Sequence, residues 1–157
     1  MATEGEFCRR LESIFFDPAN ITTAALNERC KNTLNTALGI VFTEIGPDYL
    51  CAEMPVDERT IQPLGMLNGG ASLSLIEILG SMAGNLCLDR AKWVAFGQSV
   101  TCNHIKPAFN GELVIGKATA VHTGRTSQVW DVNLYNQKGV RICKGSITLA
   151  VVPLKMP

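Results

Sequence analysis

The sequence has little charge and no excess of either sign. Of its 157 residues only 18% are charged, and 14 basic and 14 acidic residues cancel to a formal net charge of zero. A surface that follows nucleic-acid phosphates, or a polybasic membrane anchor, needs a marked excess of lysine and arginine. The composition therefore argues against nucleic-acid and membrane partners, and favours small molecules or other copies of the same chain.

Motifs for metal ions and disulfides are also missing. The six cysteines are scattered without a C-x-x-C pair, and the two histidines alone do not complete a set of metal ligands. We therefore expect no metal ion, and free thiols in a reducing compartment rather than a secreted disulfide framework. Residues 1–15 include acidic side chains and lack the apolar core of a signal peptide, which predicts a cytoplasmic protein.

The chain has the size of one domain and can bury a core without disulfide support. It contains no internal repeat, no low-complexity tract and no linker, so we predict a single domain over residues 1–157. Within this domain, residues 1–35 are predicted to form an N-terminal helical extension that includes an amphipathic helix over residues 4–16.

The longest stretch of low charge covers residues 69–88, in which Glu77 is the one charged residue. Its length would suit a membrane span, but its glycines, its serines and the central carboxylate make it a poor partner for lipid. A helix buried in a globular protein explains it better. Apolar and polar residues recur on opposite faces at helical spacing. The apolar face holds Leu75, Leu79, Met82 and Leu86, and the polar face holds Ser74, Glu77, Ser81 and Asn85.

Glu77 needs a reason to lie in this segment, because an unpaired carboxylate is costly to bury or is forced to take a proton. Perturbed acids gather at functional sites, so we predict that Glu77 takes part in chemistry and that the polar face lines a cleft. The alternative is a structural acid whose hydrogen bonds with Ser74 and Ser81 serve packing.

The rest of the chain alternates like strands, with turns between the segments. The predicted strands cover residues 36–45, 49–54, 93–105, 111–122, 128–135 and 140–152. Short connections join the last three, which should form an antiparallel meander. We therefore predict an α+β fold, in which a five- or six-stranded antiparallel sheet wraps around one long central helix.

This arrangement is the hotdog fold, and four sequence blocks resemble the hotdog acyl-CoA thioesterases. The blocks are MPVDERTIQPLGMLNGGAS at residues 54–72, continuing to Glu77 and Ser81, CNH at 102–104, HTGRTSQVW at 122–130 and SITLAV at 146–151. They occur in the family's order and span nearly all of residues 38–152. The resemblance is strongest to the group with the 1,4-dihydroxy-2-naphthoyl-CoA, enterobactin-proofreading and 4-hydroxybenzoyl-CoA thioesterases.

The resemblance implies a catalytic role for each of four residues. Glu77 would be the nucleophile or the general base for water, and both roles suit a carboxylate in an apolar cleft. Gly69 would offer its backbone N–H to the thioester carbonyl, where the helix dipole also stabilises an oxyanion. Gln62 would orient the thioester or the attacking water, and Ser81 would form a hydrogen bond in the site. The alternative for Gly69 is a tight turn into the helix.

The chain departs from the family at Asn68, where the pattern has histidine. Asparagine keeps a hydrogen-bond donor and an acceptor but does not titrate near neutral pH. A role in positioning or polarising the carbonyl is therefore compatible with Asn68, whereas a role in proton transfer is not.

For the coenzyme, the resemblance points to three groups of residues. They are Gly97; His104, Ile105, Lys106 and Pro107; and His122, Thr123, Gly124, Arg125, Thr126 and Ser127. Lys106 and Arg125 would supply positive charge for the nucleotide phosphates, although each alone could be an ordinary surface charge. Coenzyme A is then part of the substrate, and no separate cofactor is expected.

The predicted activity is hydrolysis of an aromatic or medium-size acyl-CoA, and an acyl-carrier-protein thioester is also an eligible substrate. A hotdog hydratase would need a histidine on the central helix, and none is present. The alternative function is a non-catalytic or weakly active protein that binds acyl-CoA or acyl carrier protein.

The site is predicted to be shared between subunits. Gly69 and Glu77 are eight residues apart, which is about 12 Å along a helix at about 1.5 Å per residue. This exceeds the reach of a glutamate side chain, so a carbonyl at Gly69 must meet Glu77 of another chain. We expect a homodimer, and the resemblance implies that two dimers pair as a tetramer.

Overall fold

The computed structural model describes residues 13–154. The predicted helix over residues 4–16 lies mostly outside the described residues, and residues 13–16 are not helical. Their backbone bonds to other parts of the chain instead, because Ile14 N donates to Pro47 O and Phe16 N donates to Leu86 O, both at 2.9 Å. The Phe15 side chain between them is buried.

Among the described residues, three short helices precede the sheet. They are the 3₁₀ helix η2 (Pro18–Asn20), α1 (Thr23–Arg29) and α2 (Leu34–Leu38). The prediction of a strand over residues 36–45 is therefore wrong in its first half. The Thr33 side chain caps α2 by accepting from Asn35 N, and Gly39 ends the helix in the left-handed region at φ 69°. Only the second half of this segment is extended.

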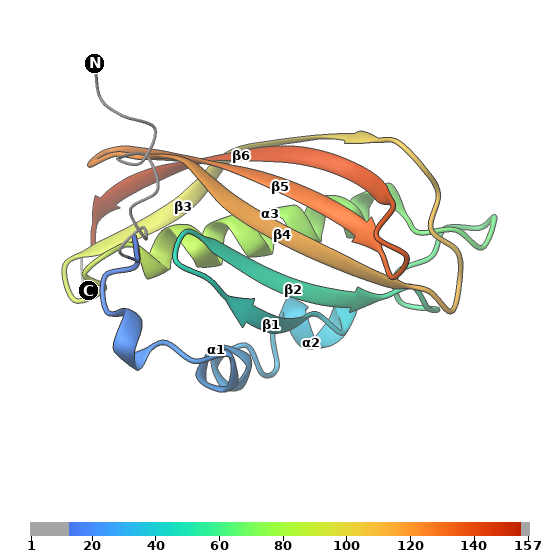
Figure 1. The fold of residues 1–157 in the computed structure, drawn as a ribbon, viewed down its shortest axis with the longest axis horizontal. Helices are drawn as coiled ribbons and strands as arrows, with labels where there is room; N and C mark the ends of the chain where they lie inside the picture. The colour runs from blue at the N-terminus through green and yellow to red at the C-terminus, as the bar shows by residue number, and fades with distance from the viewer. Residues whose placement is uncertain (1–12, 155–157) are drawn as a thin grey trace, which may run out of the picture.

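Six antiparallel strands form one sheet. They are β1 (Val41–Ile45), β2 (Tyr49–Pro55), β3 (Trp93–His104), β4 (Leu113–Thr123), β5 (Ser127–Asn136) and β6 (Arg141–Pro153). The strand order is β1-β2-β4-β5-β6-β3, so the predicted meander of β4, β5 and β6 is confirmed, and β1 and β3 are the edges. The helix α3 (Gly69–Leu86) runs along the inner face of this curved sheet (Figure 1). The prediction of an α+β hotdog fold is confirmed.

The core lies between α3 and the sheet. Leu75, Leu79 and Leu86 of the predicted apolar face are buried, and Met82 is half-buried. Glycine allows the helix to approach β6 closely, because a Cβ on Gly80 would overlap the side chain of Ile147. Of the helices in residues 13–154, none combines the length and the apolar character that crossing a bilayer requires.

We predict that Gly80→Ala lowers the free energy of unfolding. The added methyl group must displace Ile147 or move the helix. Overpacking costs about 1–3 kcal/mol, and the upper half of this range applies because the added carbon would overlap the Ile147 side chain. The better helix propensity of alanine returns up to about 1 kcal/mol, so a net loss of about 1–2 kcal/mol is expected. Denaturant unfolding measures it. Ser74→Ala is the matched control, because its hydroxyl bonds only to Gly70 O at 2.9 Å among the described residues. If Gly80→Ala and Ser74→Ala had the same free energy of unfolding, the close approach of α3 to Ile147 of β6 would be contradicted.

Candidate active site

Asn68 defines the start of α3. Its Oδ1 accepts a hydrogen bond from Gly70 N at 2.7 Å, and its backbone oxygen accepts from Ala71 N and Ser72 N. This is an N-cap, in which a side-chain oxygen satisfies one of the free N–H groups at the helix start. The acceptor of Asn68 is therefore used by the helix, and its Nδ2 donor remains for other partners.

The N–H of Gly69 is open to a ligand. Within residues 13–154 it donates to no acceptor, because the cap of Asn68 is taken by the next residue. The imidazole of His104 lies against this glycine, where a Cβ would stand 3.0 Å from His104 Nε2. A larger residue would fill this space, so glycine keeps the first turn of α3 accessible. The arrangement can stabilise negative charge on an oxygen bound at the start of the helix.

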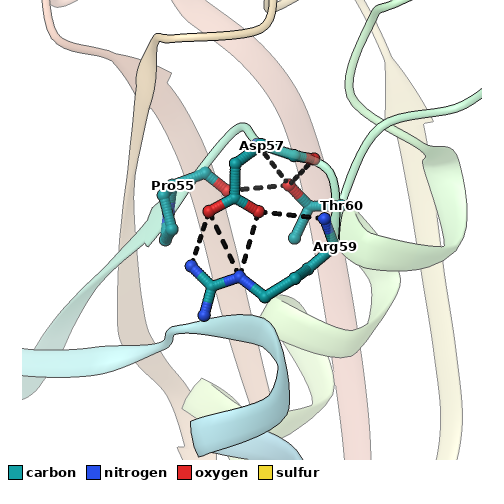
Figure 2. A network of polar contacts seen from close by, with 4 residues as sticks. All are labelled: Pro55, Asp57, Arg59 and Thr60. Atoms are coloured by element: carbon teal, nitrogen blue, oxygen red, sulfur yellow. Dashed lines mark hydrogen bonds and ion pairs between the residues drawn. The ribbon is translucent and has the colours of Figure 1, made fainter.

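A polar network holds the loop that leads from β2 to α3 (Figure 2). The Thr60 hydroxyl donates to Pro55 O at 2.8 Å and accepts from Asp57 N at 3.0 Å. The backbone oxygen of Thr60 accepts from Asn68 N at 2.8 Å, so the loop is tied to the start of α3. The Arg59 guanidinium bonds to the Asp57 carboxylate and lowers the pKa of that carboxyl.

Gln62 lies on the same loop. Its Oε1 accepts from Leu64 N at 2.6 Å, and its backbone N donates to Met66 O at 2.8 Å. These bonds hold the side-chain oxygen within the loop, and among residues 13–154 the amide Nε2 donates to no acceptor. Sequence reasoning missed Thr60, which is 1% exposed and positions this loop. A threonine in a loop carries no periodic signal that would have identified it.

One pocket brings together six of the predicted site residues. It has a volume of about 340 Å³, and these six are Gln62, Gly69, His104, Ile105, Lys106 and Pro107. Met66, Leu67 and Ile142 add apolar surface, and Ser72 and Cys143 also line the pocket. The pocket therefore combines polar donors at the start of α3 with apolar walls, as expected for a site that holds an acyl group.

Glu77 lies outside this pocket, farther along α3 and against β3. The residue is half-buried, and its carboxylate stands directly over Gly97, where any Cβ would collide with it. The Ser81 hydroxyl donates to Glu77 Oε1 at 2.8 Å. Asn85, one turn on, bonds to both Ala95 N and Ala95 O and so clamps β3 to the helix. Glu77 and Asn85 of the predicted polar face thus contact the edge strand β3, and Ser81 holds the Glu77 carboxylate from the same helix.

Ser74 does not take part in this group. Its hydroxyl donates to Gly70 O at 2.9 Å, within the first turns of the helix. The alternative in which Ser74 and Ser81 together hold Glu77 is therefore wrong for Ser74, because the hydroxyl satisfies a backbone oxygen of its own helix. Ser81 alone bonds to the carboxylate through its side chain among the described residues.

The remaining predicted coenzyme residues lie at the opposite end of β3. A second pocket of about 750 Å³ is lined by Thr123, Gly124, Arg125 and Thr126, together with Trp93. His122 and Ser127 do not line this pocket, but they flank the turn that does. Within the turn, Gly124 N donates to Ser127 O at 2.9 Å. Within one chain, the predicted site residues therefore lie in three separate places. These are the pocket at the start of α3, the Glu77 carboxylate over Gly97, and the pocket at the Trp93 end of β3.

One cluster of metal-binding side chains lies at the wall of the first pocket. Cys102, His104 and Cys143 place their ligand atoms within 4.8 Å of one another. Burial raises the pKa of the Cys143 thiol to about 12, so without a bound ion this thiol is neutral. The sequence did not predict this cluster, because no C-x-x-C pair marks it and its cysteines lie far apart in the chain. Only the pairing of β3 with β6 brings them together.

Comparisons with known proteins agree with this geometry. A family model described as "Thioesterase superfamily" matches residues 64–143. The proofreading thioesterase EntH of Klebsiella pneumoniae subsp. pneumoniae is 43% identical over 132 residues, which cover 84% of this chain and 95% of that protein. A mutant thioesterase of Pseudomonas aeruginosa has a similar crystal structure, with a TM-score of 0.87 at 40% identity over 90% of this chain and 100% of the other. A thioesterase of Haemophilus influenzae gives a TM-score of 0.83 at 37% identity, covering 87% of this chain and 94% of its own.

Proposed function

The chain belongs to the thioesterase superfamily, and we propose that it hydrolyses an aromatic or medium-size acyl-CoA to the free acid and coenzyme A. The observation that carries this proposal is the carboxylate of Glu77. Glu77 is half-buried on the central helix, and its carboxylate accepts a hydrogen bond from Ser81 and faces Gly97, with no ion pair to a basic side chain within residues 13–154. A carboxylate held in this way suits a reagent better than a surface charge.

The start of α3 is proposed to bind the thioester carbonyl. The free N–H of Gly69 and the positive end of the helix dipole would stabilise the oxyanion that forms when the carbonyl is attacked. The Nδ2 of Asn68 and the Nε2 of Gln62 are further donors, because the oxygen of each amide is already bonded to a backbone N–H. The apolar walls of the pocket would hold the acyl group.

Glu77 is proposed to supply the attack on the carbonyl carbon. As a general base, it would take a proton from water while the water oxygen bonds to the carbon. As a nucleophile, it would form an anhydride that water then hydrolyses. In both cases the carbon–sulfur bond breaks and the coenzyme leaves as a thiolate that takes up a proton. The Ser81 hydroxyl would orient Oε1 and leave the second oxygen for the reaction.

The proposed site needs two subunits, because Gly69 and Glu77 are about 12 Å apart along α3 at about 1.5 Å per residue. Strand β3 is an edge of the sheet, and its Phe96 side chain is 59% exposed. A long free edge of this kind is suited to pairing with a second copy. Antiparallel pairing about a two-fold axis would place the Trp93 end of one β3 beside the His104 end of the other.

This pairing would also join the two halves of the predicted coenzyme site. Lys106 lines the pocket near Gly69, whereas Arg125 lines the pocket at the Trp93 end of the sheet. In the homodimer, Lys106 of one subunit and Arg125 of the other would therefore approach the same nucleotide phosphates. The family resemblance further implies that two such dimers associate as a tetramer.

The proposal is tested by trapping the free thiol released from a panel of acyl-CoA thioesters and acyl-carrier-protein thioesters. The panel should pair aromatic with aliphatic acyl groups of similar size, because the apolar pocket alone does not choose between them. Release of coenzyme A from at least one thioester, well above the rate without protein, is the expected result. Tight binding of acyl-CoA without thiol release would favour the non-catalytic alternative instead.

We predict that two variants of low activity regain activity when their subunits exchange. In a heterodimer of Asn68→Ala and Glu77→Gln, one site carries both substitutions and the other carries neither. If exchange is complete, half of the dimers are mixed, and about a quarter of all sites are intact. Thiol release after mixing measures the recovery, and each variant incubated alone is the control. No recovery despite proven subunit exchange would contradict a shared site.

A further inference from the structure

Three side chains with metal-binding atoms meet where β3 lies beside β6. The register of the two strands places His104 opposite Cys143, and Cys102 lies two residues before His104 on the same face of β3. Cys143 is 1% exposed, Cys102 is half-buried and His104 is exposed. Each contributes one ligand atom, and these atoms lie within 4.8 Å of one another. The cluster is thus closed on the core side and open toward solvent.

The spacing matches the geometry of a tetrahedral zinc ion. Zinc binds sulfur at about 2.3 Å and imidazole nitrogen at about 2.0 Å, so two such ligands at the tetrahedral angle lie about 3.5 Å apart. Cys102 Sγ and His104 Nε2 are 3.5 Å apart. Two zinc-bound sulfurs lie about 3.8 Å apart by the same geometry. The limit of 4.8 Å on all three separations is compatible with that distance after small side-chain movements.

We propose that Cys102, His104 and Cys143 bind a thiophilic divalent cation of the zinc class, with its fourth coordination position facing the pocket beside Gly69. Two thiolates and one imidazole select zinc over magnesium or calcium, which prefer oxygen ligands. The two thiolates also balance the charge of the cation, so no net charge is buried. Each thiol releases its proton as it becomes a ligand. This proposal replaces the expectation of no metal ion, which rested on the histidines and on short-range cysteine spacing alone.

A disulfide fits this cluster less well than a cation does. Cys102 pairs with Gly145 and Cys143 pairs with His104, so the two cysteines are diagonal neighbours on antiparallel strands. Cα atoms of diagonal neighbours are about 7–8 Å apart, whereas a disulfide requires about 4.4–6.8 Å. A bridging cation spans the longer separation without movement of the backbone.

The test is a titration of the reduced, metal-free, full-length protein with Co²⁺, which absorbs visibly in tetrahedral sites and shows charge-transfer bands with thiolate ligands. We expect one Co²⁺ per chain, with these bands, and their loss when zinc displaces the cobalt. Cys102→Ser should weaken the Co²⁺ affinity at least ~10-fold. Loss of a residue that only forms a hydrogen bond to a metal ligand already costs about that much, and Cys102 would be a ligand itself. Cys30→Ser is the matched control, since Cys30 lies outside the cluster and should leave the titration unchanged.

Cys102→Ser is preferred to a change at Cys143 because Cys102 is only half-buried, and circular dichroism verifies that the variant folds. Absence of thiolate charge-transfer bands in the parent, or equal Co²⁺ affinity in Cys102→Ser, would overturn the assignment. So would a Cys102–Cys143 disulfide found by mass spectrometry in the protein as isolated. These readouts are spectroscopic, so they stand whether or not the protein hydrolyses acyl-CoA.

Discussion

Glu77→Gln is expected to slow acyl-CoA hydrolysis by at least ~10²-fold, because a positioned general base or nucleophile contributes about that much. The substitution keeps the size of the side chain and an oxygen that can accept the Ser81 hydrogen bond. We therefore expect an intact fold and nearly unchanged acyl-CoA affinity. Steady-state kinetics would show the loss in kcat rather than in KM.

Glu58→Gln provides the matched control for this change. Glu58 is an exposed acid in the loop before Gln62, outside both pockets, and its amide variant should hydrolyse acyl-CoA like the parent. Thermal unfolding of both variants separates a catalytic effect from a structural one. If Glu77→Gln kept near-parental turnover, Glu77 would be a structural acid held by Ser81 and the proposed chemistry would be wrong.

Asn68→Ala is expected to lower activity by about 10- to 10³-fold, the range for loss of one preorganised donor at an oxyanion. The same change removes the N-cap of α3, in which Oδ1 accepts from Gly70 N. Loss of such a cap costs about 0.5–2 kcal/mol of stability. Activity and stability must therefore be measured together, by hydrolysis kinetics and by denaturant unfolding.

Asn68→Asp separates the two roles of this residue. Aspartate is also a good N-cap, so α3 should remain as stable as in the parent. The substitution replaces the Nδ2 donor with an oxygen and adds negative charge where the oxyanion would form. Activity should therefore fall while stability is kept. Parental activity in both Asn68→Asp and Asn68→Ala would exclude position 68 from catalysis. Gly69 and Gln62 alone would then polarise the thioester carbonyl.

Asn68→His completes the series, because it restores the residue found in the resembling enzymes. It should retain activity, since imidazole can donate a hydrogen bond from the same region. Its pH profile is compared with that of the parent, in which Asn68 contributes no titration near pH ~6.5. His104 lies in the same pocket in both proteins, so only a limb present in the variant alone is assigned to position 68.

Much of the fold followed from local patterns in the chain. The helix over Gly69–Leu86 was predictable because its apolar and polar residues repeat at helical spacing. The strands β4, β5 and β6 were predictable because their residues alternate and their connections are short. The prediction of a strand over residues 36–45 is wrong around α2, because β-branched residues favour a strand there, whereas the cap by Thr33 and the left-handed turn at Gly39 define a short helix.

By itself, the sequence determined the thioesterase family, the hotdog fold and the candidate residues, because these depend on residue types in a fixed order. Tertiary structure decided which of these residues meet. It assigned the oxygen of Asn68 to the helix cap, separated Lys106 from Arg125, and placed Cys143 beside Cys102. Such contacts join positions far apart in the chain, and they arise from strand register and helix docking, which no local pattern encodes.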